Sequence, residues 1–344
     1  MDAGRSYESV AELLHDRLEF VVEAASRAVS VHNTQPWRFR PVDDGLELLA
    51  DRSRQLVVAD PRGRELVLSC GAALYNARLA VRVLGYSVEV ALLPLPGDAD
   101  LLARLTVRGR ADATAEERQL FAAIPHRHTH RGAFSPRDVP RDLLVSVQEA
   151  VVAEGAGLHF VERPGPRRAL SDLVAAADRA QRADPAFRSE LAAWTAAPGE
   201  TRPDGVPPTA YPAGDRERVA FPIRDFAAGR GWGYAEPGDD GLKPPVAVLT
   251  TRGDSLVDWL VAGQALQRML LRAATRWTFA AMFSQPLESP DARVLVRDEL
   301  GTADFPQMIL QLGHSTIVRA TARRPVGDVL ENGTDLRQSA TPGD

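Results

Sequence analysis

The fold of this chain is decided by one stretch, Ser30-Val31-His32-Asn33-Thr34-Gln35-Pro36-Trp37-Arg38-Phe39. It follows residues 9–28, in which apolar side chains recur every three or four positions, as in an amphipathic helix. Pro36 cannot continue that helix. The residues after it alternate apolar and polar, which predicts a strand. We therefore expect a non-helical loop between a helix and a strand.

This loop is unusually rich in neutral hydrogen-bonding side chains. Ser30, His32, Asn33 and Gln35 supply hydroxyl, imidazole and amide groups within six positions. Such groups suit a flat heterocycle with carbonyl and N–H edges, or a ribityl chain. An ordinary polar turn explains them equally well when the loop is considered alone.

Outward from the loop, helices alternate with short strands in two similar passes. Helices are predicted over 9–28, 69–84, 116–124, 141–152 and 168–182, and a further one is capped by Asp254 or Ser255. Strands are predicted over 37–40, 46–49, 88–93, 101–107, 158–161, 246–250 and 308–312. This order indicates an α+β protein with two similar halves, 1–124 and 125–330, and a polar tail, 331–344.

The segment from Pro198 to Pro245 interrupts the second half. It holds nine Pro and eight Gly together with several aromatic residues. It is too long and irregular for an ordinary connection, and its aromatics argue against plain disorder. A flexible linker is one interpretation. We favour the other, a structured loop folded over a site like a lid.

Two basic segments are candidates for anion binding. If Arg127-His128-Thr129-His130-Arg131 is extended, Arg127, Thr129 and Arg131 share one face, which suits a phosphate dianion. The histidines on the opposite face could bind a metal, but no acidic residue within the segment completes such a site. A solvated basic turn is the plain alternative. Arg323 and Arg324, after the last predicted strand, are either surface charge or a second part of the phosphate site.

Bulk composition narrows the classes of function. The chain has 344 residues and a net charge of −5, so no global basic field favours nucleic acid. The N-terminus lacks a signal core, and no uninterrupted apolar run reaches the roughly 20 residues that span a bilayer. Cys70 is the single cysteine, and we expect it in the core. These features predict a soluble, cytoplasmic protein without membrane or nucleic-acid partners.

The motifs above resemble those of the nitroreductase-like FMN-binding family, in its fused, double-length Acg type. Ser30 to Phe39 resembles the P-S-x-x-N-x-Q-P-W-x-F stretch of nitroreductases, with Val29 in place of the usual proline. Arg127 to Phe134 resembles the R-x-[ST]-x-R/K segment that opens an ordinary nitroreductase. Further landmarks of the Acg type are similar to 204–207, 224–226, 263–267, 284–288, 306–307 and 323–325.

The resemblance implies one FMN between the halves of a pseudo-dimer, because only one complete set of motifs exists. Arg127, Thr129, Arg323 and Arg324 would hold the phosphate, and Arg131 the ring or the phosphate. Ser30 and Asn33 would bond the ring edge or the ribityl chain, while His32 and Gln35 shape the loop. Thr278 would stand near the place where relatives put a glycine whose backbone N–H meets flavin N5. No metal is implied.

Three functions follow from this reading. The first is an FMN-dependent oxidoreductase that takes a hydride from NAD(P)H or a substrate and reduces a small organic acceptor. The second is a non-enzymatic FMN store closed by the 198–245 segment. The third is a phosphate- or nucleotide-binding protein without flavin. A fused pseudo-dimer needs no partner for its site, so a monomer and a homodimer are both compatible with each function.

Overall fold

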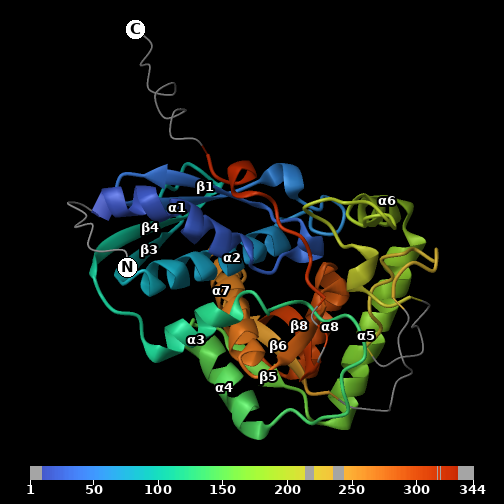
Figure 1. The fold of residues 1–344 in the computed structure, drawn as a ribbon. Coiled ribbons are helices and arrows are strands. Elements are labelled where there is room, and N and C mark those ends of the chain that lie inside the picture. The colour runs from blue at the N-terminus through green and yellow to red at the C-terminus, as the bar shows by residue number, and fades with distance from the viewer. Residues whose placement is uncertain (1–9, 214–220, 235–243, 316, 318, 332–344) are drawn as a thin grey trace.

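The structure, a computed structural model, describes residues 10–213, 221–234, 244–315, 317 and 319–331 (Figure 1). Two sets of elements follow one another in the same order. The first is α1 (Val10–Ser26), β1 (Trp37–Val42), β2 (Gly45–Ala50), α2 (Arg64–Val83), β3 (Tyr86–Leu92), β4 (Leu101–Arg110) and α3 (Ala115–Ala123). The second is α4 (Arg141–Val152), β5 (Gly157–Phe160), β6 (Val246–Thr251), α7 (Leu256–Ala274), β7 (Thr278–Phe283) and β8 (Phe305–His314). It is interrupted by α5 (Pro164–Ala183) and α6 (Pro185–Ala193) before β6, and by α8 (Pro290–Leu300) before β8.

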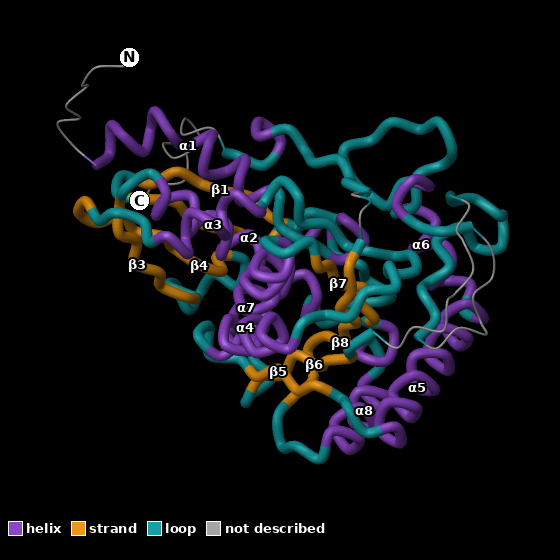
Figure 2. The backbone as a smooth tube through the Cα atoms, turned by 60° about the horizontal axis from the view of Figure 1, so that its bottom comes forward, coloured by secondary structure: helices purple, strands orange, loops and turns teal. Residues whose placement is uncertain are grey.

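The two sets build sheets of the same topology. The strand orders are β1-β2-β4-β3 and β5-β6-β8-β7, and every neighbouring pair is antiparallel. Figure 2 shows the strands as two separate groups with α2 and α7 between them. This repetition confirms the predicted α+β class with two similar halves. The boundary between 124 and 125 stays a prediction, because core side chains of both halves form one continuous cluster.

Local sequence explains where the main elements begin. The turn at Asp43 and Asp44 joins β1 to β2, with Val42 opposite Gly45. Ser255 caps α7 and forms a capping box with Asp258, as one of the two predicted caps. The helix α2 begins at Arg64 rather than at 69, because Asp60 accepts the Leu66 N–H at 2.9 Å and thereby extends the helix N-terminus.

The halves meet where α2 and α7 cross, and two glycines make that crossing close. Gly71 and Gly263 each occupy the eighth position of their helix. A Cβ built on Gly263 would lie 2.0 Å from the Leu68 carbonyl oxygen, and one built on Gly71 would lie 2.4 Å from the Leu260 carbonyl oxygen. The backbones therefore touch without intervening side chains, which fixes the distance between the halves.

The described parts of 198–245 are packed rather than extended into solvent. Tyr211 and Phe226 join Leu56 and Phe187 in a separate apolar cluster, in which each is buried. The rest of the segment, 214–220 and 235–243, lies outside the described residues. Because apolar burial opposes chain entropy, the described parts are structured, as the sequence favours.

The chain returns to the first half after β8. Phe39 N–H donates to Val329 O at 2.7 Å, and Glu331 N–H donates to Phe39 O at 2.8 Å, beside β1. Glu331 also pairs with Arg40 at 2.8 Å. The predicted tail therefore begins later than 331, because this residue has both backbone and charged partners. The remaining tail, 332–344, lies outside the described residues.

The helix α2 bears on the prediction that no segment spans a membrane. By length and composition alone, α2 is long and apolar enough to cross a bilayer. In the structure, 83% of its apolar window is buried inside the protein, with Cys70 fully covered. Its apolar character therefore serves the core between the two halves.

Candidate functional site

A cavity of about 80 Å³ lies at the junction of the halves. Its walls come from the 29–32 loop and α2 of the first half, and from 129–131, α7, β7, 284–285 and Met308 of the second. Ile223, Arg224 and Phe226 of the 198–245 segment complete the wall. The predicted residues Ser30, His32, Thr129 and Arg131 therefore meet at one cavity, although they are about 100 positions apart in sequence.

The 30–35 loop is held in a sparsely populated backbone conformation. His32, Asn33 and Gln35 have φ angles of 44°, 57° and 51°, values that are uncommon for residues other than glycine. Such conformations persist only where surrounding contacts determine them, and they gather at functional sites. The loop also supports itself, because the Ser30 hydroxyl accepts the Gln35 N–H at 3.1 Å.

Two distant segments clamp the loop. The Asn33 amide donates to Gly205 O and Ala322 O, both at 3.1 Å. The Gln35 amide donates to Pro203 O at 2.8 Å and accepts the Arg324 N–H at 2.8 Å. Both amides thus hold the loop to the 198–245 segment and to residues 322–324 near the C-terminus.

Beside the loop, basic side chains gather without acidic partners. The Arg323 guanidinium donates to Asn33 Oδ1 at 3.0 Å and to Ala28 O at 3.1 Å. Arg127 and Arg323 both reach the Arg27 carbonyl, at 3.3 and 3.4 Å. Among the described residues, no ion pair includes Arg127, Arg131 or Arg323. The 30–35 loop of the first half and the arginines of the second half therefore lie together.

These guanidinium groups also have unused donors. Arg127 is 7% exposed, and its Nε and Nη1 are buried without a hydrogen-bond partner, as is Nε of Arg323. Burial lowers the pKa of Arg127 and of Arg131 to about 10 each. Burial, then repulsion by Arg127, lowers the pKa of Arg323 to about 9. A bound anion would relieve both the repulsion and the unsatisfied donors.

This arrangement predicts that Arg127→Met stabilises the ligand-free protein, because the substitution removes an uncompensated buried charge while keeping most of the side-chain volume. We expect a gain of about 1–3 kcal/mol, measured by urea unfolding in buffer without multivalent anions. Arg137→Met, at an exposed position, serves as the control with little change. A lower stability for Arg127→Met would show that this charge is compensated.

Burial lowers the pKa of both His32 and His128 below the usual value for histidine. Both ring nitrogens of His32 are buried without partners, and burial, with Arg224 and Arg131 nearby, holds its pKa well below the usual value. His128 packs on Phe279 and His130 on Phe134, with ring centroids 4.1 and 4.5 Å apart. Within the described residues, no three His, Cys, Asp or Glu side chains form a group that could hold a metal ion.

The cavity lining also lacks Asn33, Gln35, Arg127 and Arg323, which belong to the clamped loop and the basic group beside it, and two further predicted residues lie apart from the cavity. Thr278 does not line the cavity; it begins β7, and its hydroxyl lies 3.2 Å from His314 Nδ1. The strand carries Ala281 and Met282 to the cavity instead, three and four residues later. Arg324 pairs with Asp51 at 3.5 Å and donates to Gln35 O at 3.2 Å. It therefore clamps the loop and does not belong to the group of unpaired guanidiniums.

Some cavity residues have no clear signal in sequence. Arg224 is 8% exposed and pairs with Glu288 at 2.6 Å, and Glu65 on α2 is 3% exposed. The sequence did not indicate either residue as part of a site, because a single charged residue in a helix or loop is most often exposed to solvent. The resemblance to 224–226 and 284–288 was the available signal, and it did not assign roles.

Two proteins of Mycobacterium tuberculosis (strain H37Rv) align along nearly the whole chain. "Putative NAD(P)H nitroreductase Rv3131" is 34% identical over 90% of this chain and 90% of its own. "Putative NAD(P)H nitroreductase acg" is 31% identical over 91% of this chain and 95% of its own.

No family model matches the chain. A solved nitroreductase with bound FMN from Desulfitobacterium hafniense DCB-2 aligns over 62% of this chain and 97% of its own. Its sequence identity to this chain is 14% and its TM-score is 0.39. The near full-length identity to the mycobacterial proteins is sufficient, and the chain belongs to the nitroreductase-like family of the Acg type.

Proposed function

We propose that the chain binds one FMN across its two halves and acts as an oxidoreductase, passing a hydride from NAD(P)H to a small organic acceptor. The observation that carries this proposal is the group Arg127, Arg131 and Arg323, whose guanidiniums have no carboxylate partner among the described residues. Arg127 is buried, and Arg131 lines the cavity built by both halves. The names of the Acg-type relatives support the reaction class.

The residues present fit the parts of this cofactor. Arg127 and Arg323 offer unpaired N–H donors to a phosphate dianion, near Asn33. Ser30, Thr129 and Arg131 line the adjoining cavity, where the ring and the ribityl chain would lie. The backbone of β7 at Ala281 and Met282, rather than at Thr278, would take the place expected beside the flavin ring.

The corresponding place on the other side of the pseudo-dimer supports a stoichiometry of one. There, the α4–β5 connection contains Glu154, where the α1–β1 connection has the 30–35 loop. Arg78 and Arg268 bond Glu154 at 2.7 and 2.9 Å, and Arg268 also reaches Glu116 at 3.2 Å. Arg78, Arg268, Glu116 and Glu154 line a third cavity, of about 330 Å³, here called the Glu154 cavity. Because these arginines are paired with carboxylates, the Glu154 cavity lacks the uncompensated charge that attracts a phosphate.

The bound cofactor would supply two-electron hydride chemistry, while the chain controls access and charge. Phe226 stands edge-on to His32 at 5.5 Å, and the Arg131 guanidinium lies 5.3 Å above the Phe226 ring. Residues 221–226 would thus act as a lid that excludes water. Neutral His32 can donate or accept one hydrogen bond to a ligand without adding charge. No second chain is required, so a cytoplasmic monomer or homodimer serves equally.

Anaerobic reduction tests the enzymatic function. The purified protein should be yellow, and NADPH or NADH should bleach it rapidly, since a hydride donor would reach the ring beneath the lid. A yellow protein that only dithionite bleaches would contradict the enzyme with a nicotinamide donor. That result would favour the alternative, an FMN store, because the 221–226 wall then excludes the nicotinamide. Colourless protein that takes up no added FMN would refute both.

A further inference from the structure

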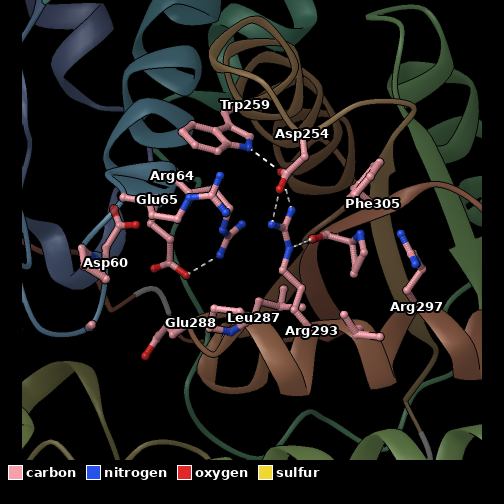
Figure 3. A pocket seen from close by; sticks show the side chains of 16 residues that line it. Asp60, Arg64, Glu65, Asp254, Trp259, Leu287, Glu288, Arg293, Arg297 and Phe305 are labelled. Atoms are coloured by element: carbon pink, nitrogen blue, oxygen red, sulfur yellow. Dashed lines mark hydrogen bonds and ion pairs between the residues drawn. The ribbon is translucent and has the colours of Figure 1, made fainter.

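A second cavity, of about 240 Å³, lies beside the first and opens near Pro61 and Arg62, which are exposed. Its lining has four acids and four arginines: Asp60, Glu65, Asp254, Glu288, Arg62, Arg64, Arg293 and Arg297. Figure 3 shows Asp60, Glu65 and Glu288 on one side of this cavity and the Asp254–Arg293 pair on the other. Glu65 lines this cavity and also the first one, so it stands in the wall between them.

Glu65 has two acidic and two basic neighbours. Its carboxylate has one close cation, Arg64, whose Nη2 donates to Oε1 at 2.9 Å while Nη1 donates to Gln307 O at 2.8 Å. Asp60 and Glu288 are its acidic neighbours, and Arg224 is a further cation. Arg224, however, is bound to Glu288 at 2.6 Å.

The neighbouring acids have fixed hydrogen-bond partners. Asp60 accepts the Leu66 N–H at the start of α2, where the helix dipole favours negative charge. Glu288 accepts hydrogen bonds from Ser284 and Gln181, each at 2.7 Å, besides Arg224. Burial, followed by repulsion from Glu288, raises the pKa of the Glu65 carboxyl. Burial raises the pKa of Glu65 to about 8 and that of Asp60 to about 6, so of these two carboxyls Glu65 is the one expected to hold a proton at pH 7.

We propose that Glu65 is a proton donor to the electron acceptor in the first cavity, and that water in the second cavity restores its proton. This inference rests on the proposed oxidoreductase function. In this proposal, protons from solvent pass through the second cavity, past Asp60, and reach Glu65. Neither the family relationship nor the flavin site requires such a group.

The step balances as a two-electron reduction. In the reduction of a quinone, a hydride equivalent from an NAD(P)H-class donor would bring two electrons and one proton to the acceptor. The second proton comes from the Glu65 O–H bond, which breaks and leaves a carboxylate. The acceptor oxygen gains that proton. A proton from solvent then re-forms the O–H bond at Glu65 through the second cavity.

Infrared spectroscopy tests the protonated state independently of turnover. At pH 7 the protein should show the carbonyl stretch of a buried, undissociated carboxylic acid. Glu65→Gln should abolish this band, while Glu19→Gln, at an exposed position on α1, should retain it. Raising the pH should remove the band from the unsubstituted protein. Identical acid bands in Glu65→Gln and the parent protein would overturn the inference, and so would the absence of any such band from the parent.

The pH profile of acceptor reduction then tests delivery of the proton. Because the folded pKa is raised, the rate of the parent should be full at lower pH and fall as pH rises through that pKa. Glu65→Gln should lower the rate roughly a hundredfold and remove this fall, whereas Glu65→Asp should retain a titrating acid and part of the rate. An unchanged profile in Glu65→Gln, with flavin still bound, would overturn the inference alone. Loss of flavin from the parent would instead refute the proposed function.

Discussion

Arg127→Ala should weaken FMN binding roughly 10- to 100-fold, the largest effect that we expect on the cofactor. A charge-assisted hydrogen bond contributes about 1.5–3 kcal/mol, and each 1.4 kcal/mol corresponds to about tenfold in affinity. Arg127 has two buried donors available for such bonds. Fluorescence titration of the flavin-free protein with FMN measures the change in Kd.

The matched control is Arg137→Ala, which removes a guanidinium from an exposed position. It should leave the Kd for FMN unchanged, since exposed charges are screened by solvent. Arg323→Ala should behave like Arg127→Ala, because the two guanidiniums share the Arg27 carbonyl. If Arg127→Ala retained flavin as tightly as the control, the phosphate site would have to lie elsewhere.

The largest effect on stability is expected for Gly263→Ala. The new Cβ would lie 2.0 Å from Leu68 O and 2.8 Å from the Gly71 Cα, and both are backbone atoms of α2. The helices would have to separate, which we expect to lower the free energy of unfolding by about 3 kcal/mol. Urea unfolding followed by circular dichroism gives the value.

Gly109→Ala controls for the loss of a glycine. A Cβ there meets nothing within 4 Å, so the free energy of unfolding should stay within about 0.5 kcal/mol of the parent. Gly263→Ala should also weaken FMN binding, because the cavity is built on both α2 and α7. A loss of stability below about 1 kcal/mol would mean that the crossing can relax and does not fix the spacing of the halves.

Hydrophobic periodicity and helix-capping residues in the sequence predict much of the fold. The hairpin at Trp37 to Ala50, the helix after Ser255 and the exact bounds of α4 follow from local patterns. The α6 and α8 helices and the β7 strand were not expected. Their identity depends on burial against other parts of the chain: Phe187 of α6 packs with Leu56, and Val296 of α8 lies in the second half's own cluster. Local propensity does not contain that information.

The candidate site was predictable in its residues and less so in its geometry. Sequence indicated that Asn33 and the basic segments would meet, and the Arg323–Asn33 bond of 3.0 Å places them together. The role of Thr278 stays a prediction, while the strand register set by pairing with β8 brings Ala281 and Met282 to the cavity. Glu65 escaped notice because its burial between two cavities is a property of the tertiary structure.

A crystal structure of the purified protein with FMN tests the central claim most directly. The account predicts one FMN per chain, with its phosphate within hydrogen-bonding distance of both Arg127 and Arg323 and its ring beside Ser30, Thr129 and Phe226. An FMN bound in the Glu154 cavity, or no FMN at the junction of α2 and α7 despite saturating concentrations in solution, would contradict it.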